Sequence, residues 1–121
     1  KSIETKKYLN LNNYGNHYRD FTYIEDVLKI ISKLIKSNLK KHEIFNVCSN
    51  KPLNILKITN LFKSKGLKIR KIKKHPADVY KTHGDNKKVL KIAKNINFTN
   101  PYNAILNTYK WYKSKKIIKK I

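Results

Sequence analysis

A chain of 121 residues can form one compact domain with a hydrophobic core, but it is too short for a complete two-lobed enzyme that binds a dinucleotide and a second nucleotide. Its formal net charge of +22 would suit a polyanionic partner such as nucleic acid. Only Arg19 and Arg70 among the 29 basic residues are arginines, however, and base-reading sites favour the guanidinium fork. A small lysine-rich nucleic-acid-binding protein is therefore the alternative hypothesis, and nucleic acid is not the partner that we expect.

The chain shows no signal for a membrane or for secretion. No stretch has the roughly 20 apolar residues of a membrane-spanning helix, and the opening residues lack the apolar core of a secretory signal. The single cysteine, Cys48, cannot form an internal disulfide. We therefore expect a cytoplasmic protein without a membrane partner. Because the chain starts at Lys1 and contains no Met, we also expect its amino terminus to be a cut edge.

The first half of the chain predicts a strand, a long helix and a second strand. Leucines that alternate with polar residues before a turn indicate a short strand at residues 8–12. Thr22 and Glu25 form a capping box, and apolar residues at helical spacing follow, so a helix is expected over residues 23–39. The apolar run at residues 44–48 is bounded by charged and turn residues and favours a buried strand.

The second half predicts three more helices and one strand. Asn54 can cap a helix that Gly66 ends, and a lysine-rich strand follows over residues 67–72. Asp85 can cap a third helix, and Asn100 followed by proline begins a fourth, whose Tyr and Trp side chains we expect in the core. The terminal seven residues are expected to form a frayed, solvated tail. The pattern is mixed α/β, with about four helices and short strands.

Residues 19–26 form the most specific motif of the chain, because they read Arg-Asp-Phe-Thr-Tyr-Ile-Glu-Asp. They resemble the Arg-Asp-Phe-Thr-Tyr-Ile-Asp-Asp signature of the extended short-chain dehydrogenases, most closely the UDP-glucuronate 4-epimerases, with Glu25 as the one conservative change. In that family the arginine reaches the diphosphate of the bound sugar nucleotide, which a guanidinium fork suits. The resemblance implies the same role for Arg19. Without it, Arg19 is a surface residue ahead of a capped helix.

Three later segments match the same family in order. Residues 45–52 resemble its Tyr-Asn-Ile-Gly-Asn-x-x-Pro strand and turn, with Cys48 in the place of glycine. Residues 75–88 resemble its Gln/Arg-Pro-Gly-Asp-Val-x-x-Thr-x-Ala-Asp-x-x-Lys segment, which closes over the nucleotide, although His75 and Ala77 depart from it. Residues 109–113 resemble its closing Trp-Tyr helix. The substrate-binding residues that the resemblance implies are Arg19, Asp78, His75 and Asn12.

The resemblance also implies what the chain contributes and what it lacks. Family members bind NAD on an amino-terminal Gly-rich lobe and transfer a proton with a Tyr-x-x-x-Lys pair. With 3 glycines, the chain has no such loop. We therefore expect residues 1–121 to be a single partial domain, the carboxyl-terminal UDP-sugar-binding lobe of an extended Rossmann-type epimerase whose NAD-binding lobe is absent from this chain.

The parent enzyme implied by the resemblance is a homodimeric isomerase or dehydratase that acts on a UDP-sugar for capsule or cell-wall polysaccharide synthesis. The fragment alone is expected to be inactive. Which UDP-sugar is used, and whether the parent epimerises or dehydrates, stay open. A truncated gene product or a degenerate paralogue that keeps only the scaffold is a further alternative.

Other chemistries receive little support from the sequence. Tyr109 and Tyr112 each begin a Tyr-x-x-x-Lys pair, but with 8 tyrosines and so many lysines two such pairs are expected by chance. Cys48 suits a small buried strand residue better than a nucleophile. A metal site could combine histidines with Asp78 and Asp85, but none has the spacing of a dedicated ligand set, and we expect no metal. The four histidines are His17, His42, His75 and His83.

Overall fold

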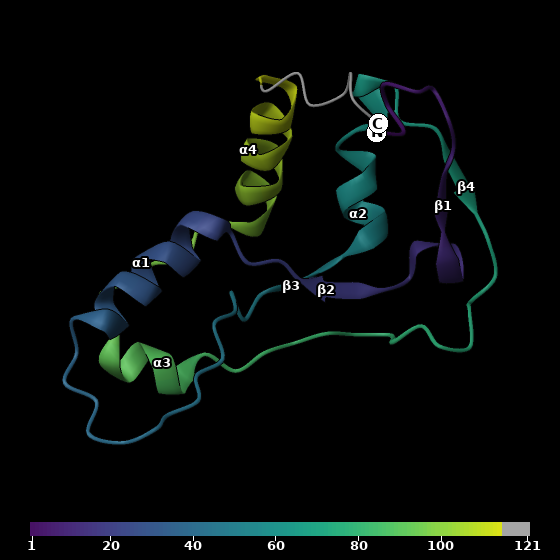
Figure 1. The fold of residues 1–121 in the computed structure, drawn as a ribbon. Coiled ribbons are helices and arrows are strands. Elements are labelled where there is room, and N and C mark those ends of the chain that lie inside the picture. The colour runs from purple at the N-terminus through teal and green to yellow at the C-terminus, as the bar shows by residue number, and fades with distance from the viewer. Residues whose placement is uncertain (115–121) are drawn as a thin grey trace.

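The computed structural model describes residues 1–114 as a mixed α/β arrangement, so the predicted fold class is confirmed, while the predicted tail at residues 115–121 lies outside the described residues (Figure 1). Within the described part, no helix is both long enough and apolar enough to cross a membrane. The strands are β1 (Leu9–Leu11), β2 (Tyr18–Asp20), β3 (Pro52–Asn54) and β4 (Ile69–Lys71). The helices are α1 (Ile24–Ile35), α2 (Ile55–Asn60), α3 (Lys87–Ile92) and α4 (Pro101–Ser114), with short 3-10 helices at Asn12–Gly15 and Lys63–Lys65.

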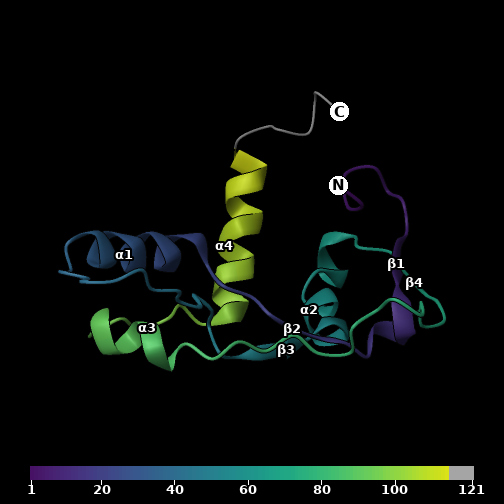
Figure 2. The same ribbon diagram turned by 60° about the horizontal axis from the view of Figure 1, so that its bottom comes forward.

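The strands pair two by two. β1 and β4 are parallel, with Leu9 opposite Ile69, whereas β2 and β3 are antiparallel, with Arg19 opposite Leu53. Figure 2 shows β1 and β4 at one margin beside α2, the β2–β3 pair in the middle, and α1 with α3 at the opposite side. The predicted strands at residues 8–12 and 67–72 are therefore confirmed, whereas β2 was not anticipated because three residues inside a longer motif show no alternation.

The main hydrophobic core lies between α1 and α3. Ile30 of α1 is fully buried against Val89 of α3 and Ala93, the residue directly after that helix. Burial of side chains as large as those of Ile30 and Val89 contributes about 1.5 to 3 kcal/mol each. Partly buried side chains that surround these three are Leu34, Phe45, Val47, Leu90, Ile96 and Phe98.

The predicted strand at residues 44–48 is wrong. The segment supplies Phe45 and Val47 to the core, which explains its apolar pattern, but no strand pairs with it among residues 1–114. An extended segment becomes a strand only when a neighbour completes its backbone hydrogen bonds.

The predicted long helix is confirmed as α1, but its capping box is wrong. Tyr23 occupies the N-cap position without a side-chain hydrogen bond. Thr22 instead accepts a hydrogen bond from the Ser49 backbone N–H at 3.2 Å, and Glu25 accepts one from the Tyr23 hydroxyl. The helix ends at Ile35, before the predicted residue 39, because the Ser37 hydroxyl bonds the Leu34 carbonyl and competes with a further turn.

The other helix starts follow the sequence closely. Asn54 caps α2 by accepting from the Lys57 N–H at 3.2 Å, and Gly66 takes the left-handed conformation at φ 86° after the following 3-10 turn. The N-cap of α3 is Asn86 and not the predicted Asp85. The Asp85 carboxylate nevertheless accepts a hydrogen bond from the N–H of Lys87, the first residue of the helix, at 2.9 Å. α4 begins at proline as predicted.

The aromatic side chains of α4 do not all lie in a core. Trp111 is 54% exposed, so its predicted burial is wrong, whereas Tyr109 packs edge-on against Phe62 at a centroid distance of 5.2 Å. Figures 1 and 2 show why, since α4 projects away from the α1–α3 pair and no described element covers its outer side. Only its first turns, at Pro101 and Ala104, are buried.

Candidate functional site

The candidate site forms where β1 and β4 end. Parallel strands place their carboxyl ends at the same edge of a sheet, where ligands of α/β proteins commonly bind. Two backbone hydrogen bonds hold these ends together, from Ile72 N to Leu11 O at 3.0 Å and from Tyr14 N to Ile72 O at 3.1 Å. The residue after β1 therefore meets the loop after β4, residues 72–81.

Three of the predicted site residues form one polar group at this edge, the Asn12–Asp78 cluster. The Asn12 amide donates a hydrogen bond to Oδ2 of Asp78 at 2.7 Å, and the His75 backbone N–H donates to the same oxygen at 3.3 Å. The His75 ring accepts from the Ala77 N–H at 3.2 Å. His75 is exposed, and its ring stabilises its own turn.

Asp78 carries a negative charge at neutral pH. Desolvation acts to raise its pKa, but the hydrogen bonds from Asn12 and His75 and the nearby charges of His17 and His75 lower the pKa of Asp78 below its ordinary value. An ionised carboxylate only accepts hydrogen bonds. The cluster can therefore bind hydroxyl or N–H groups through Asp78, but this oxygen pair would repel a phosphate.

Arg19, on β2, contacts the same loop near its end, at Tyr80. Its Nη1 donates to the Tyr18 carbonyl at 2.8 Å and to the Tyr80 carbonyl at 3.4 Å, and the Tyr18 and Tyr80 rings meet edge to face at 5.8 Å. Among residues 1–114 no carboxylate pairs with this half-buried guanidinium. Its remaining donors can therefore serve an anion, and the loop that holds Asp78 also positions Arg19.

Asp20 holds three segments together behind Arg19. Its carboxylate accepts from the Ser49 hydroxyl at 2.5 Å and from the Asn50 and Gly84 backbone N–H groups, each at 3.1 Å. Burial opposes ionisation, but these donors lower the pKa of Asp20. Sequence reasoning assigned no role to this residue. The available signal was an acid within a strand, where acids are uncommon unless they are hydrogen-bonded.

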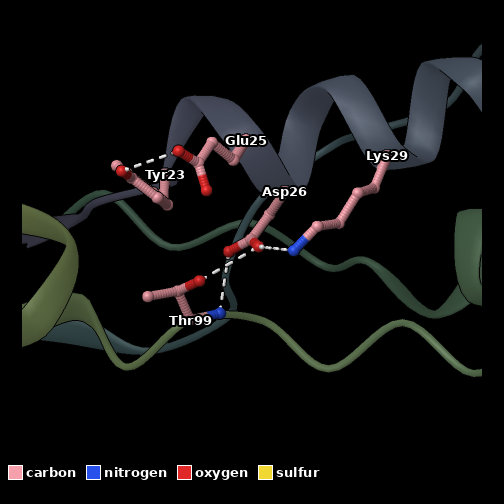
Figure 3. Close-up of polar contacts among 5 residues, drawn as sticks. All are labelled: Tyr23, Glu25, Asp26, Lys29 and Thr99. Carbon is pink, nitrogen blue, oxygen red and sulfur yellow. Dashed lines mark hydrogen bonds and ion pairs between the residues drawn. The ribbon is translucent and has the colours of Figure 1, made fainter.

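Asp26, the last acid of the motif, makes contacts with a distant segment (Figure 3). It is fully buried at the start of α1 and accepts from the Thr99 backbone N–H at 2.7 Å and from the Thr99 hydroxyl at 3.0 Å. The Lys29 ammonium lies 3.6 Å from the same carboxylate. Asp26 therefore ties α1 to the segment that precedes α4.

The remaining histidines and Cys48 lie in different surroundings. His17 is 5% exposed, and its Nε2 has no hydrogen-bond partner among residues 1–114. The His83 ring contacts the Asn50 side chain. No group of three or more His, Cys, Asp or Glu side chains in the described part could hold a metal ion. Burial and the nearby Asp20 charge raise the pKa of the Cys48 thiol, which disfavours the nucleophilic thiolate at neutral pH.

Comparison of the sequence with known proteins finds partial matches. No protein-family model matches the chain. An uncharacterized protein of Methanocaldococcus jannaschii is 35% identical over 95 residues, which cover 76% of this chain and 29% of that protein. Protein CapI of Staphylococcus aureus is 26% identical over 105 residues, covering 70% of this chain and 31% of that protein. The chain thus spans less than a third of the length of these curated relatives.

Solved structures match over nearly the whole chain. The UDP-glucuronic acid 4-epimerase from Bacillus cereus, in complex with UDP-glucuronic acid and NAD, has a TM-score of 0.78 at 21% identity, over 93% of this chain and 37% of that one. TunA, an NAD-dependent NDP-hexosamine 5,6-dehydratase involved in tunicamycin biosynthesis, has a TM-score of 0.77 at 21% identity, over 93% and 38%. The chain has the fold of a carboxyl-terminal portion of the extended short-chain dehydrogenases. The fold implied by the motif at residues 19–26 is thereby confirmed.

Proposed function

We propose that this chain forms the sugar-nucleotide-binding side of the active-site cleft in an NAD-dependent epimerase similar to the UDP-glucuronate 4-epimerases. The observation that carries the proposal is that one loop, residues 72–81, holds both the Asn12–Asp78 cluster and a guanidinium that no described carboxylate neutralises. The order of the four matching motifs and the fold support it.

The proposed role of each side chain in binding the sugar nucleotide follows from its chemistry. Arg19 binds the diphosphate, because its charge and its fork of donors match phosphate oxygens. Asp78 accepts hydrogen bonds from hydroxyl groups of the ligand, and its contact with Asn12 orients the amide at the end of β1. His75 supports this loop through its turn.

The residues of this chain do not fit a dinucleotide site, because packing or a turn accounts for each glycine. Gly15, at φ +84°, faces Leu56 so closely that an added Cβ would lie 3.1 Å from the leucine Cβ. Gly66 ends a helical turn, and an added Cβ at Gly84 would lie 2.4 Å from the sulfur of Cys48. We therefore assign NAD, the catalytic Tyr and the chemical step to an amino-terminal lobe of the parent enzyme.

We treat residues 1–121 as one partial domain of that enzyme. Exposed apolar side chains form a stripe on α1, and the chain has 9063 Å² of accessible surface, whereas a compact monomer of this mass has about 6,800 Å². A covering lobe explains both features. A homodimeric, cytoplasmic parent that supplies precursors for capsule or cell-wall polysaccharide completes the proposal. The residues of the stripe are Ile24, Leu28, Ile31 and Ile35.

Calorimetric titration of UDP into the full-length protein tests the proposal. Arg19→Ala should weaken binding by about 1.5 to 3 kcal/mol, the range for hydrogen bonds to charged groups, and Arg19→Lys should recover part of the loss. Arg70→Ala is the matched control, because it removes the other arginine, on β4, and should leave UDP affinity unchanged. Equal affinities of the wild type and Arg19→Ala would eliminate the proposed role.

A further inference from the structure

The β1–β4 sheet has one face that α2 does not cover. Successive side chains of a strand point to opposite faces. Ile69 and Lys71 line a cavity with Leu56 and Asn60 of α2, so this set of positions faces the helix. Figures 1 and 2 show α2 on one side of the strands only. The opposite face, which we call the basic sheet face, carries Tyr8, Asn10, Lys68 and Arg70, all of them exposed.

This face lies in a strongly positive part of the molecule. No Asp or Glu occurs at residues 5–19 or 44–77, the two segments that contain β1 and β4. Five exposed lysines lie within β4 or close to it along the chain, and in the described part of the chain none of them pairs with a carboxylate. Their charges therefore add to those of the sheet instead of being cancelled. These lysines are Lys63, Lys65, Lys71, Lys73 and Lys74, of which Lys63 and Lys71 line the cavity on the α2 side of the sheet.

A guanidinium lies over an aromatic ring on this face, in a cation–π contact. The Arg70 guanidinium carbon lies 5.1 Å from the centroid of the Tyr8 ring, and Tyr8 remains 54% exposed. Nucleic-acid bases stack on aromatic rings and on guanidinium planes, while lysines along the same surface hold the phosphates. The exposed Asn10 amide, opposite Arg70 in the register, adds a hydrogen-bonding group beside the pair.

We propose that the basic sheet face binds single-stranded nucleic acid, an activity beyond the sugar-nucleotide site. The bases stack at Tyr8 and Arg70, and the flanking lysines hold the backbone. A membrane surface is a poorer fit, because the face presents no aliphatic side chain for insertion among lipids. Duplex DNA is also a poorer fit, because two three-residue strands offer no element that enters a groove.

Fluorescence anisotropy with the full-length protein and labelled oligothymidine or oligouridine of about 16 nucleotides tests this assignment. Binding should persist at about 0.15 M salt. The logarithm of the binding constant should fall linearly with the logarithm of the salt concentration. Tyr8→Ala should weaken it at least about fivefold at every salt concentration. Lys68→Ala should reduce the salt slope by about one. Arg70→Lys should lose affinity with an unchanged slope, because it keeps the charge and loses the stacking plane.

The matched control is Lys36→Ala with Lys40→Ala, two exposed lysines that follow α1 in the sequence, and Figure 2 shows α1 on the opposite side of the molecule from β1 and β4. This pair should weaken binding less than Lys68→Ala alone, and thermal melts establish that every variant is folded. The proposal is overturned by absence of binding at about 0.15 M salt or by an equal effect of the control pair. Displacement by excess UDP, or equally tight binding to phosphatidylserine vesicles, overturns it as well.

Discussion

Asp20 shows how one side chain can connect segments that are distant in sequence. Its three acceptor contacts reach the turn after residue 48 and the turn before α3, and its own N–H donates to the Thr82 hydroxyl at 3.2 Å. Asp20→Asn keeps the size but removes the charge and one acceptor. We expect the free energy of unfolding at about pH 7 to fall by about 1.5 to 3 kcal/mol, measured by urea denaturation.

The contribution of Asp20 to the free energy of unfolding depends on pH. The folded pKa of Asp20 lies below its unfolded value, so its contribution to stability is present above the unfolded pKa, about 3.9, and is lost as the pH falls through the folded pKa. The stability difference between the wild type and Asp20→Asn should therefore narrow below about pH 4. A difference that stays constant down to acid denaturation would contradict the assigned role.

At the scale of elements, the turn before α3 packs against the segment before β3 through one close contact. An added Cβ at Gly84 would lie 2.4 Å from the sulfur of Cys48 and 2.8 Å from its Cβ. In the family pattern that residues 45–52 and 75–88 resemble, glycine stands at the position of Cys48 and alanine at the position of Gly84. This chain therefore has the larger residue at the first of these positions and the smaller residue at the second. The two departures therefore compensate each other in one packing contact.

This contact predicts a non-additive pair of substitutions. Gly84→Ala alone should destabilise the protein by about 1 to 3 kcal/mol, the usual cost of overpacking. The double variant Cys48→Gly with Gly84→Ala should be more stable than Gly84→Ala, because removing the thiol makes room for the methyl group. Urea denaturation of the wild type, the two single variants and the double variant gives the four free energies of unfolding of a double-mutant cycle. Strict additivity would show that the two positions do not interact.

At the scale of the whole molecule, α1 is apolar on two sides. One side packs against α3 through Ile30, and the other carries the exposed stripe that we assign to a covering lobe. The double variant Leu28→Gln with Ile31→Gln should lower the melting temperature of the full-length protein and leave that of the isolated 121-residue chain almost unchanged. The isolated chain itself should be only marginally stable. A sharp melt well above the mesophile range would show a self-sufficient domain.

We assign the chemical step to a part of the parent enzyme that this chain does not contain. Purified alone, the 121-residue chain should not convert any UDP-hexose or UDP-hexuronate even with NAD added, because tighter substrate binding cannot replace a missing general base. NMR of the sugar products measures the turnover. Any conversion above that of a buffer control, by protein free of contaminating epimerase, would refute the assignment of the chemistry to another lobe.

Features that depend on neighbours along the chain could be predicted from the amino-acid sequence. Helix α1 follows from apolar spacing, the Asn54 cap and the Gly66 turn from local backbone chemistry, and the fold from an eight-residue motif. The same local reasoning failed at residues 44–48, because an apolar run shows burial but not whether a strand lies beside it.

Contacts between side chains that are distant in the sequence could not be predicted and follow from the fold. Asn12 and Asp78 are 66 residues apart and touch because β1 and β4 are parallel, so that both strands end at the same edge. The sequence allows Thr22 to cap α1, but in the fold its hydroxyl accepts a hydrogen bond from the Ser49 N–H at 3.2 Å. A polar side chain bonds whichever partner the fold brings within reach, and distance along the chain does not carry that information.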